Sequence, residues 1–411
     1  MKKGTEFAAA GISAGVVSAA VPIAYSAYLT KKRRPIWKSD MLRAENGKLV
    51  TEGGEEVKLI GLDLSPENVK CRENGEEKKL TQKQLFDSLE ERFGNYGARE
   101  VFGRYYENLI SKPDIKAFKK SGINCVRIPI YSYIAFKDGS LKKIEPDLDR
   151  IDKIVAGCKK AGIYVILSLS YAPGFSDSEE DLFLAQNRKG LSCRNDTIKM
   201  WAKISTHFKD EPAIAAYELL DKASLGFECG ETTSSFFIRA AKALRTLEDP
   251  HVLCVPYDDK NTDYEKLKEL NIAVCVGGGY CSAYEAKALS GKAETVCQNG
   301  VPALVTGLVP SSFSGAYGEL SPACSGCVMA RYKGSENALY RSESPVIDIA
   351  QDSFDGINDK LSGSANLKAF DKNGALEKEL KEALSGVKFK KVINKPVKIK
   401  YARGKAYFAG I

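Results

Sequence analysis

Histidine is nearly absent from this chain of 411 residues, which contains only His207 and His251. Zinc and non-haem iron sites rely heavily on histidine ligands, so this shortage argues against a histidine-rich metal centre. No other pattern in the sequence indicates a bound group. We therefore expect neither a metal nor a cofactor.

Acidic residues are missing from the C-terminal segment, residues 386–411, which carries eight lysines and arginines. The whole chain has 61 basic and 53 acidic residues, so the rest of the chain is balanced at 53 of each. This balance argues against a large basic face for nucleic acid. We interpret residues 386–411 as a basic tail, which is either a solvated appendage or a source of extra affinity for a membrane or polyanion.

Cysteine is not scarce, but the pattern of a disulfide framework is lacking. The eleven cysteines are an odd number, and most stand singly inside apolar segments, where they resemble small buried hydrophobic residues. Cys324 and Cys327 form one C-x-x-C motif. Without a second pair or a nearby histidine, a coincidental spacing is favoured over zinc binding or redox chemistry.

The N-terminus has little charge beyond its first residues. Residues 7–29 contain no charged side chain, and they lie between Lys2–Lys3 and the KKRR cluster at 31–34. A run of this length can span a bilayer, so we expect a single-pass membrane anchor with its basic stop over residues 1–35. The rival interpretation is a signal peptide cleaved near Ala24–Ser26. The KKRR cluster favours a cytoplasmic position for the following domain.

Residues 36–385 show the alternation of an α/β barrel. Turn dipeptides at Asn46–Gly47 and Gly53–Gly54 predict an N-terminal β-hairpin. Beyond it, amphipathic helices that end in glycine, as at Gly122 and Gly162, run into continuous apolar segments typical of parallel strands buried on both faces. About eight such units predict a TIM (β/α)8 barrel, and no glycine-rich loop supports a dinucleotide-binding fold.

Several linked motifs follow one another within residues 42–384: GLDL after the hairpin, SGINCVRIPIY, AGIYVILSLSYAPG, FKDEPAIAAYELLDKA and NGVPALVTGLV. In this order they resemble glycoside hydrolase family 5, the cellulase-like retaining enzymes. The resemblance implies a (β/α)8 barrel that cleaves β-linked glucans or mannans. It also implies two catalytic glutamates, the acid at the end of strand four and the nucleophile on strand seven. The resemblance favours an extracellular location, whereas the KKRR cluster favours a cytoplasmic one.

The positions that carry the family's chemistry are mostly altered. Arg127 matches the family's arginine, but Lys222 stands at the position of the acid and Gly307 at that of the nucleophile. The Asn-Glu-Pro triplet of strand four is replaced by Asp221-Lys222-Ala223. Ser170 replaces a histidine, Ala330 replaces the tryptophan platform, and strand six retains only the aromatic Tyr280. Because retaining hydrolysis needs two carboxylates about 5 Å apart, we expect no catalytic residues and a membrane-anchored pseudoenzyme.

Two enzymatic alternatives remain open. In the first, displaced carboxylates at Glu319 or Asp221 support an active retaining β-glycosidase of the endoglucanase or mannanase type. Against Glu319, the preceding SSFSGA segment resembles a loop and leaves too little chain for a barrel helix before strand eight. In the second, Lys222 forms a Schiff base. Glu218 matches a common non-catalytic acidic position and is interpreted as structural.

The altered positions also predict a ligand site. A lysine at position 222 beside Arg127 is expected to make the mouth cationic and suited to a carbohydrate or a small acidic ligand. The alternative is that Lys222 pairs with Asp221 or Glu218 and that no ligand binds. Trp37 and Trp201 do not fall at cleft positions, so tyrosines are the available platforms. The expected ligand-binding residues are Arg127, Lys222, Asp221, Ser170, Tyr171, Tyr131 and Tyr280.

Overall fold

The computed structural model describes most of the chain from residue 34 onward. The described residues are 34–73, 75–135, 148–175, 182–185, 187–221, 233–258, 262–277, 279–281, 283–310, 313–320, 323–335, 338–343, 345–385, 401–402 and 405–406.

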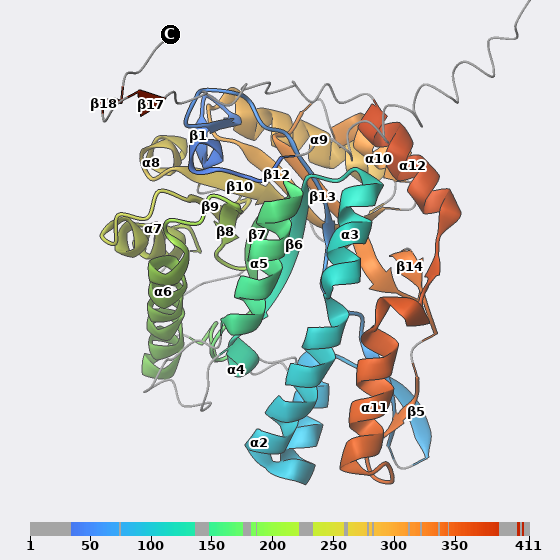
Figure 1. Cartoon of the computed structure of the whole chain (residues 1–411). Helices are drawn as coiled ribbons and strands as arrows, with labels where there is room; N and C mark the ends of the chain where they lie inside the picture. The colour runs from blue at the N-terminus through green and yellow to red at the C-terminus, as the bar shows by residue number, and fades with distance from the viewer. Residues whose placement is uncertain are drawn as a thin grey trace, which may run out of the picture.

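Eight parallel strands form a closed barrel, as the sequence predicts (Figure 1). They are β3 (Leu59–Asp63), β6 (Cys125–Tyr131), β7 (Tyr164–Tyr171), β8 (Ile214–Glu218), β9 (Val252–Pro256), β10 (Ile272–Val276), β12 (Ala303–Pro310) and β13 (Gly326–Gly334). Each strand pairs with the next, and β13 closes the ring on β3. Every residue of β6, β8, β9 and β10 is buried, as expected for strands covered on both faces.

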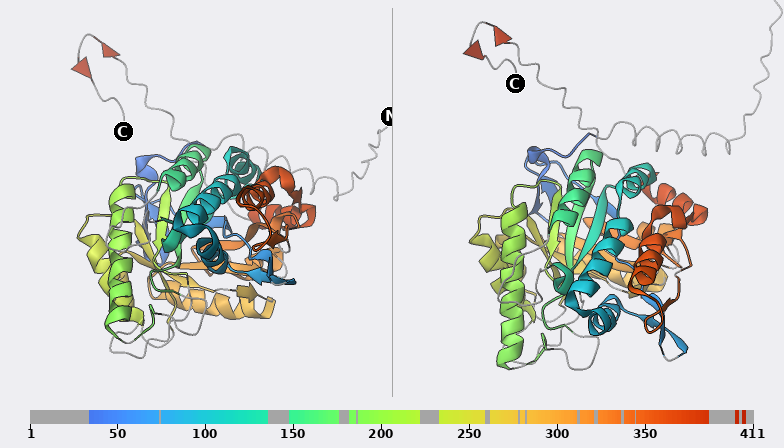
Figure 2. Two further views of the ribbon diagram at one scale, coloured as in Figure 1. Left: turned by 90° about the horizontal axis from the view of Figure 1, so that it is seen from below. Right: turned by 60° about the horizontal axis from the view of Figure 1, so that its bottom comes forward.

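Helices surround the barrel in Figures 1 and 2. They are α2 (Gln82–Leu109), α3 (Lys112–Ser121), α4 (Ser132–Ala135), α5 (Asp149–Ala161), α6 (Arg188–Phe208), α7 (Thr233–Arg245), α8 (Tyr264–Glu269), α9 (Ala283–Gln298), α10 (Phe313–Leu320), α11 (Phe354–Ala365) and α12 (Gly374–Ser385). The capping box at Thr81 begins α2, and Gly94, at φ 72° and ψ 168°, interrupts it. Gly122 and Gly162 end α3 and α5 in the left-handed conformation that suits glycine.

The predicted hairpin covers the N-terminal end of the barrel, at the top of Figure 1. Strands β1 (Leu42–Glu45) and β2 (Lys48–Thr51) are joined by Asn46 and Gly47, both with positive φ. A Cβ atom on Gly47 would lie 2.4 Å from the backbone oxygen of Cys297, so only glycine allows this close approach. The opposite end, where the parallel strands finish, is called the mouth below.

Small strands extend the barrel at its edges. The first group is β4 (Val69–Glu73), β5 (Glu76–Leu80) and β15 (Ile347–Asp348). The second is β14 (Ala338–Arg341) and β16 (Asp371–Lys372), and β11 (Gly279–Cys281) pairs with β12. Short 3₁₀ turns occupy Lys38–Asp40 (η1) and Leu367–Ala369 (η2). Within the tail, Tyr401–Ala402 (β17) and Lys405–Ala406 (β18) pair with each other.

The expected single-pass membrane localisation requires correction. Across the described part of the chain, no helix combines the length and apolar character needed to cross a bilayer. The described helices of at least 18 residues, α2 and α6, carry charged side chains along their length and pack one face on the barrel. The segment 7–29, to which the anchor was assigned, lies outside the described residues.

Candidate functional site

Arg127 is the centre of a charged cluster at the mouth. Its side chain projects inward from β6 and is 1% exposed. Nε donates to Glu218 at 2.6 Å, Nη1 donates to Asp63 at 2.5 Å, and Nη2 donates to Asp221. These contacts join the ends of β3, β6 and β8, which are neighbouring regions of the barrel wall.

The three carboxylates differ in exposure and in their other partners. Glu218 and Asp63 are 2% and 9% exposed, whereas Asp221 is 31% exposed. Glu218 also accepts from the Thr306 hydroxyl at 2.9 Å, and Asp63 accepts from a backbone N–H at 2.7 Å. Among these groups, only Asp221 presents a substantial part of its carboxylate to solvent at the mouth.

The cluster carries three acidic groups on one guanidinium. Burial by itself would lower the pKa of Arg127, but its carboxylate neighbours outweigh this and raise it well above the ordinary value. Burial also raises the pKa of Asp221; the charge of Arg127 opposes the rise, and the charges of Glu218 and Asp63 add to it. Among the described residues, the cluster therefore holds three acidic groups around one ionised guanidinium. Lys222, on which the expectation of a cationic mouth depends, lies outside the described residues.

The raised pKa of Asp221 predicts a pH-dependent effect of Asp221→Asn. The folded protein binds the Asp221 proton more tightly than the unfolded chain does. Ionisation of Asp221 therefore lowers the free energy of unfolding as the pH rises above the pKa of this carboxyl in the unfolded chain. Asparagine is neutral and retains an acceptor for Arg127. We expect the variant to be more stable by about 1 kcal/mol at pH 7.5, with the gain shrinking towards pH 4.5. Urea unfolding at both pH values measures this, and a constant gain or a loss at pH 7.5 would contradict it.

Gly307 occupies β12, immediately after Thr306. Its φ is 69°, and the pairing of β12 with β13 shifts register between Thr306 and Leu308. Left-handed backbone at a β-bulge is a conformation that glycine adopts without the steric penalty of a Cβ atom. Gly307, which the sequence analysis assigned to the nucleophile position, therefore has a local backbone geometry that disfavours other residues.

Replacing glycine by alanine should have opposite effects on the free energy of unfolding at Gly307 and at a glycine within a helix. Gly307→Ala should lower the free energy of unfolding by about 1–2 kcal/mol, the cost of left-handed backbone for an L-residue. Gly291→Ala, within α9, should raise it by about 0.5–1 kcal/mol, because a Cβ atom there meets nothing within 4 Å and alanine favours helix. Urea denaturation measures both, and equal effects would show that Gly307 is not conformationally required.

The other expected ligand residues fall in different environments. Ser170 donates to Asp221 at 3.1 Å and so belongs to the cluster. Tyr131 is 6% exposed and packs against Tyr106 and Tyr171, with ring centroids 5.8 and 5.9 Å away. Tyr171 is half-buried at the end of β7. Tyr131 is therefore part of the packed wall, and Tyr171 is the more accessible aromatic ring of the two.

Some predicted positions lie away from the mouth or outside the described residues. Glu319 is exposed near the end of α10, a helix and not the loop expected, and its backbone oxygen accepts from Ser290 on α9 at 2.9 Å. This end of α10 leads to the start of β13, opposite the mouth. Lys222 is outside the described residues, and Tyr280 and Ala330 are described only as backbone in β11 and β13.

Sequence reasoning did not identify Asp63 and Thr306 as site residues. Asp63 is the acidic residue of the GLDL motif and ends β3, whose carboxyl end meets that of β6 at the mouth. An acidic residue at the end of a predicted barrel strand was the available signal. Thr306 directly precedes Gly307, and no feature of the sequence distinguished its hydroxyl from an ordinary strand residue.

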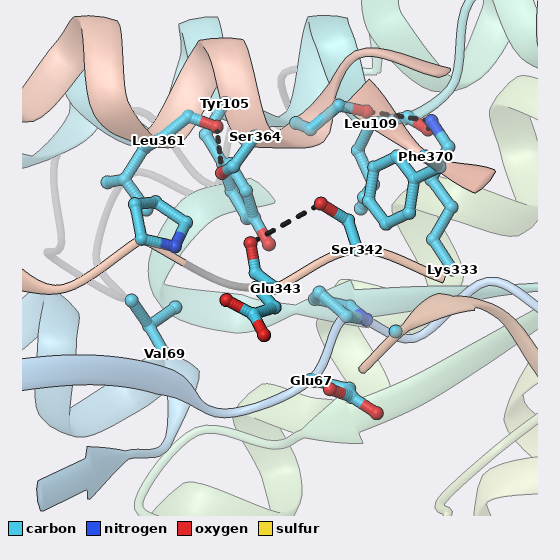
Figure 3. Close-up of a pocket in the computed structure, with 14 residues that line it drawn as sticks. Glu67, Val69, Tyr105, Leu109, Lys333, Ser342, Glu343, Leu361, Ser364 and Phe370 are labelled. Atoms are coloured by element: carbon cyan, nitrogen blue, oxygen red, sulfur yellow. Dashed lines mark hydrogen bonds between the residues drawn. The ribbon is translucent and has the colours of Figure 1, made fainter. Parts of the chain in front are cut away.

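A lateral pocket lies outside the barrel wall, between α2, α11 and the end of β13 (Figure 3). Lys333 contributes to its lining and is buried, with Nζ donating to the backbone oxygens of Leu109 and Ala365 at 2.7 Å and pairing with Asp114 at 2.8 Å. Burial lowers the pKa of Lys333, and Asp114 opposes the shift. All three Nζ protons have partners, so this lysine serves to join the ends of three helices.

The comparisons with known proteins agree with the motifs. Residues 75–221 match the model of the cellulases, glycosyl hydrolase family 5. A β-xylosidase of Phanerodontia chrysosporium is 26% identical over 220 residues, which are 51% of this chain and 44% of that protein. Cellodextrinase A of Ruminococcus flavefaciens is 38% identical over 123 residues, which are 29% of this chain and 34% of that protein. The matches therefore span less than half the length of these relatives.

The solved structures support the fold. An endogalactoceramidase crystal structure aligns with a TM-score of 0.54 at 13% identity and covers 84% of each chain. At this identity the likeness concerns the arrangement of the barrel alone. The match of residues 75–221 to the family model confirms the resemblance to the cellulases of glycosyl hydrolase family 5 over that segment, and the closed eight-stranded barrel agrees with it.

Proposed function

We propose that this chain is a family 5-like barrel that binds carbohydrate at its mouth without hydrolysing it. The observation that carries the proposal is Gly307, which has no carboxylate and has left-handed backbone at the position where the family resemblance expects the nucleophile. Without a nucleophile, the covalent intermediate of retaining hydrolysis cannot form.

The remaining carboxylates do not supply a substitute pair. Asp63 and Glu218 are buried and held by Arg127, so neither is free to attack an anomeric carbon. Asp221 is the most exposed of the three carboxylates, but it also forms an ion pair with Arg127. The cluster is better suited to holding three strand ends together and to offering polar acceptors to a ligand's hydroxyl groups.

Neutral oligosaccharides are the ligand class that this arrangement favours. Asp221, Ser170 and Tyr171 lie at neighbouring strand ends and combine hydroxyl-binding groups with an aromatic ring. Among the described residues of the mouth, the surplus of carboxylate over guanidinium disfavours acidic sugars. The relatives are named as a β-xylosidase and a cellodextrinase, so xylo- and cello-oligosaccharides are the first ligands to test.

A glycosidase with Asp221 as a displaced acid is the second candidate. Its supporting observation is the raised pKa of Asp221, since a carboxylic acid that stays protonated at higher pH is a better proton donor. This alternative still requires a nucleophile or an activated water from a residue other than Gly307.

The test combines binding and turnover on the full chain. Cellohexaose and xylohexaose should raise the thermal midpoint, a uronic acid oligosaccharide should not, and no new reducing ends should appear. Product release that disappears in Asp221→Asn would favour the second candidate. Absence of both binding and turnover would reject the proposal.

A further inference from the structure

A cysteine pair lies at the end of the barrel opposite the mouth. Cys324 precedes β13, and Cys327 is its second residue. Both are free thiols, and their sulfur atoms are 3.1 Å apart. A disulfide bond is about 2.05 Å long, so bonding requires the sulfurs to approach by only about 1 Å. The spacing that sequence reasoning treated as coincidence thus places two thiols in reach of each other.

The two thiols differ in their electrostatic surroundings. The hydrogen bond from Cys327 lowers the pKa of Cys324; burial opposes this, and the charge of Lys58 and a backbone hydrogen bond from Gly326 support it. The pKa of Cys327 is raised, first by its hydrogen bond to Cys324 and then by burial. Cys324 is therefore the better nucleophile and Cys327 the natural second thiol.

Access to the pair is restricted. Cys324 is 6% exposed and Cys327 is 1% exposed. The β1–β2 turn covers this end, since the intervening Ser325 donates its hydroxyl proton to the Gly47 backbone oxygen at 2.9 Å. A small oxidant can therefore reach these thiols more easily than a bulky disulfide reagent can. Within the described residues, no group of three or more His, Cys, Asp and Glu side chains is arranged to hold a metal ion.

We propose that Cys324 and Cys327 are a peroxide-oxidisable dithiol that closes reversibly to a disulfide. The Cys324 thiolate attacks one oxygen of hydrogen peroxide, the O–O bond breaks, and water and a sulfenic acid at Cys324 form. Cys327 then loses its proton and attacks the Cys324 sulfur, which releases a second water. Two thiols and one peroxide thus become one disulfide and two waters. An added dithiol reductant restores both thiols.

Peptide mapping of the full chain tests this proposal. Trypsin releases residues 293–331 as one peptide, which contains Cys297, Cys324 and Cys327. After limited hydrogen peroxide, quenching and alkylation, we expect this peptide to lose two alkylatable thiols, with fragmentation assigning the bond to Cys324 and Cys327. Dithiothreitol should restore them.

Variants separate the roles of the three cysteines. Cys297→Ser is the matched control and should form the same disulfide. Cys327→Ser should instead accumulate a sulfenic acid at Cys324 that dimedone traps, and Cys324→Ser should give neither product. The proposal fails if all three thiols of the native chain remain alkylatable, if the bond joins Cys297, or if the buried Cys254 and Cys275 oxidise at the same rate.

Discussion

Replacing Arg127 by methionine should lower the free energy of unfolding by about 3–5 kcal/mol at pH 7.5, the usual cost of leaving buried charges without their partner. The substitution removes the cation that Asp63, Glu218 and Asp221 share. Urea unfolding monitored by circular dichroism measures the loss, which should be the largest single-residue effect at the mouth.

The same variant should lose less stability in acid. Without the guanidinium, the like charges and burial raise the carboxyl pKa values of the folded state above those of the unfolded chain. The folded variant then binds more protons, so its stability increases as pH falls from 7.5 to 5. Arg72→Met is the matched control, because the Arg72–Glu77 pair is exposed and should contribute less than about 1 kcal/mol. Equal losses in the two variants, or no pH dependence for Arg127→Met, would show that the cluster is not a charge-balanced unit.

Placing glutamates at the two positions where the family resemblance expects them should not produce catalysis. We expect the double variant Lys222→Glu, Gly307→Glu to release reducing sugar no faster than the parent chain. A working general acid–base group alone would raise the rate of hydrolysis roughly 10²–10⁴-fold, so the difference is readily measured. The left-handed backbone at Gly307 disfavours a glutamate and directs its Cβ away from an ordinary strand position. Ser170 and Ala330 also remain different from the family pattern.

The matched control for this experiment is Lys222→Gln with Gly307→Ala, which introduces similar backbone strain without carboxylates. Release of reducing ends by the glutamate variant at ten or more times the rate of this control would contradict the expectation. Such a result would mean that the barrel retains the rest of a working glycosidase site.

The barrel was predictable because its signals are local. Apolar runs long enough for buried strands, glycines after helices and the Asn46–Gly47 turn each act within a few residues, and the structure contains β6, β7, α3, α5 and the hairpin where these signals predict them. Glu319 was misplaced in a loop because a helix of eight residues leaves a weak periodic pattern.

The sequence by itself determined the barrel and the resemblance to the family. Only the tertiary structure decided which charged groups Arg127 contacts and how close the two cysteines of the C-x-x-C motif lie. The strand ends bring Asp63, Glu218 and Asp221 onto Arg127, and of these the sequence had indicated only Asp221 as a ligand-binding neighbour. The 3.1 Å approach of Cys324 and Cys327 depends on how the chain enters β13. Local patterns specify elements, whereas electrostatics depends on distances between residues far apart in the chain, which only the closed barrel determines.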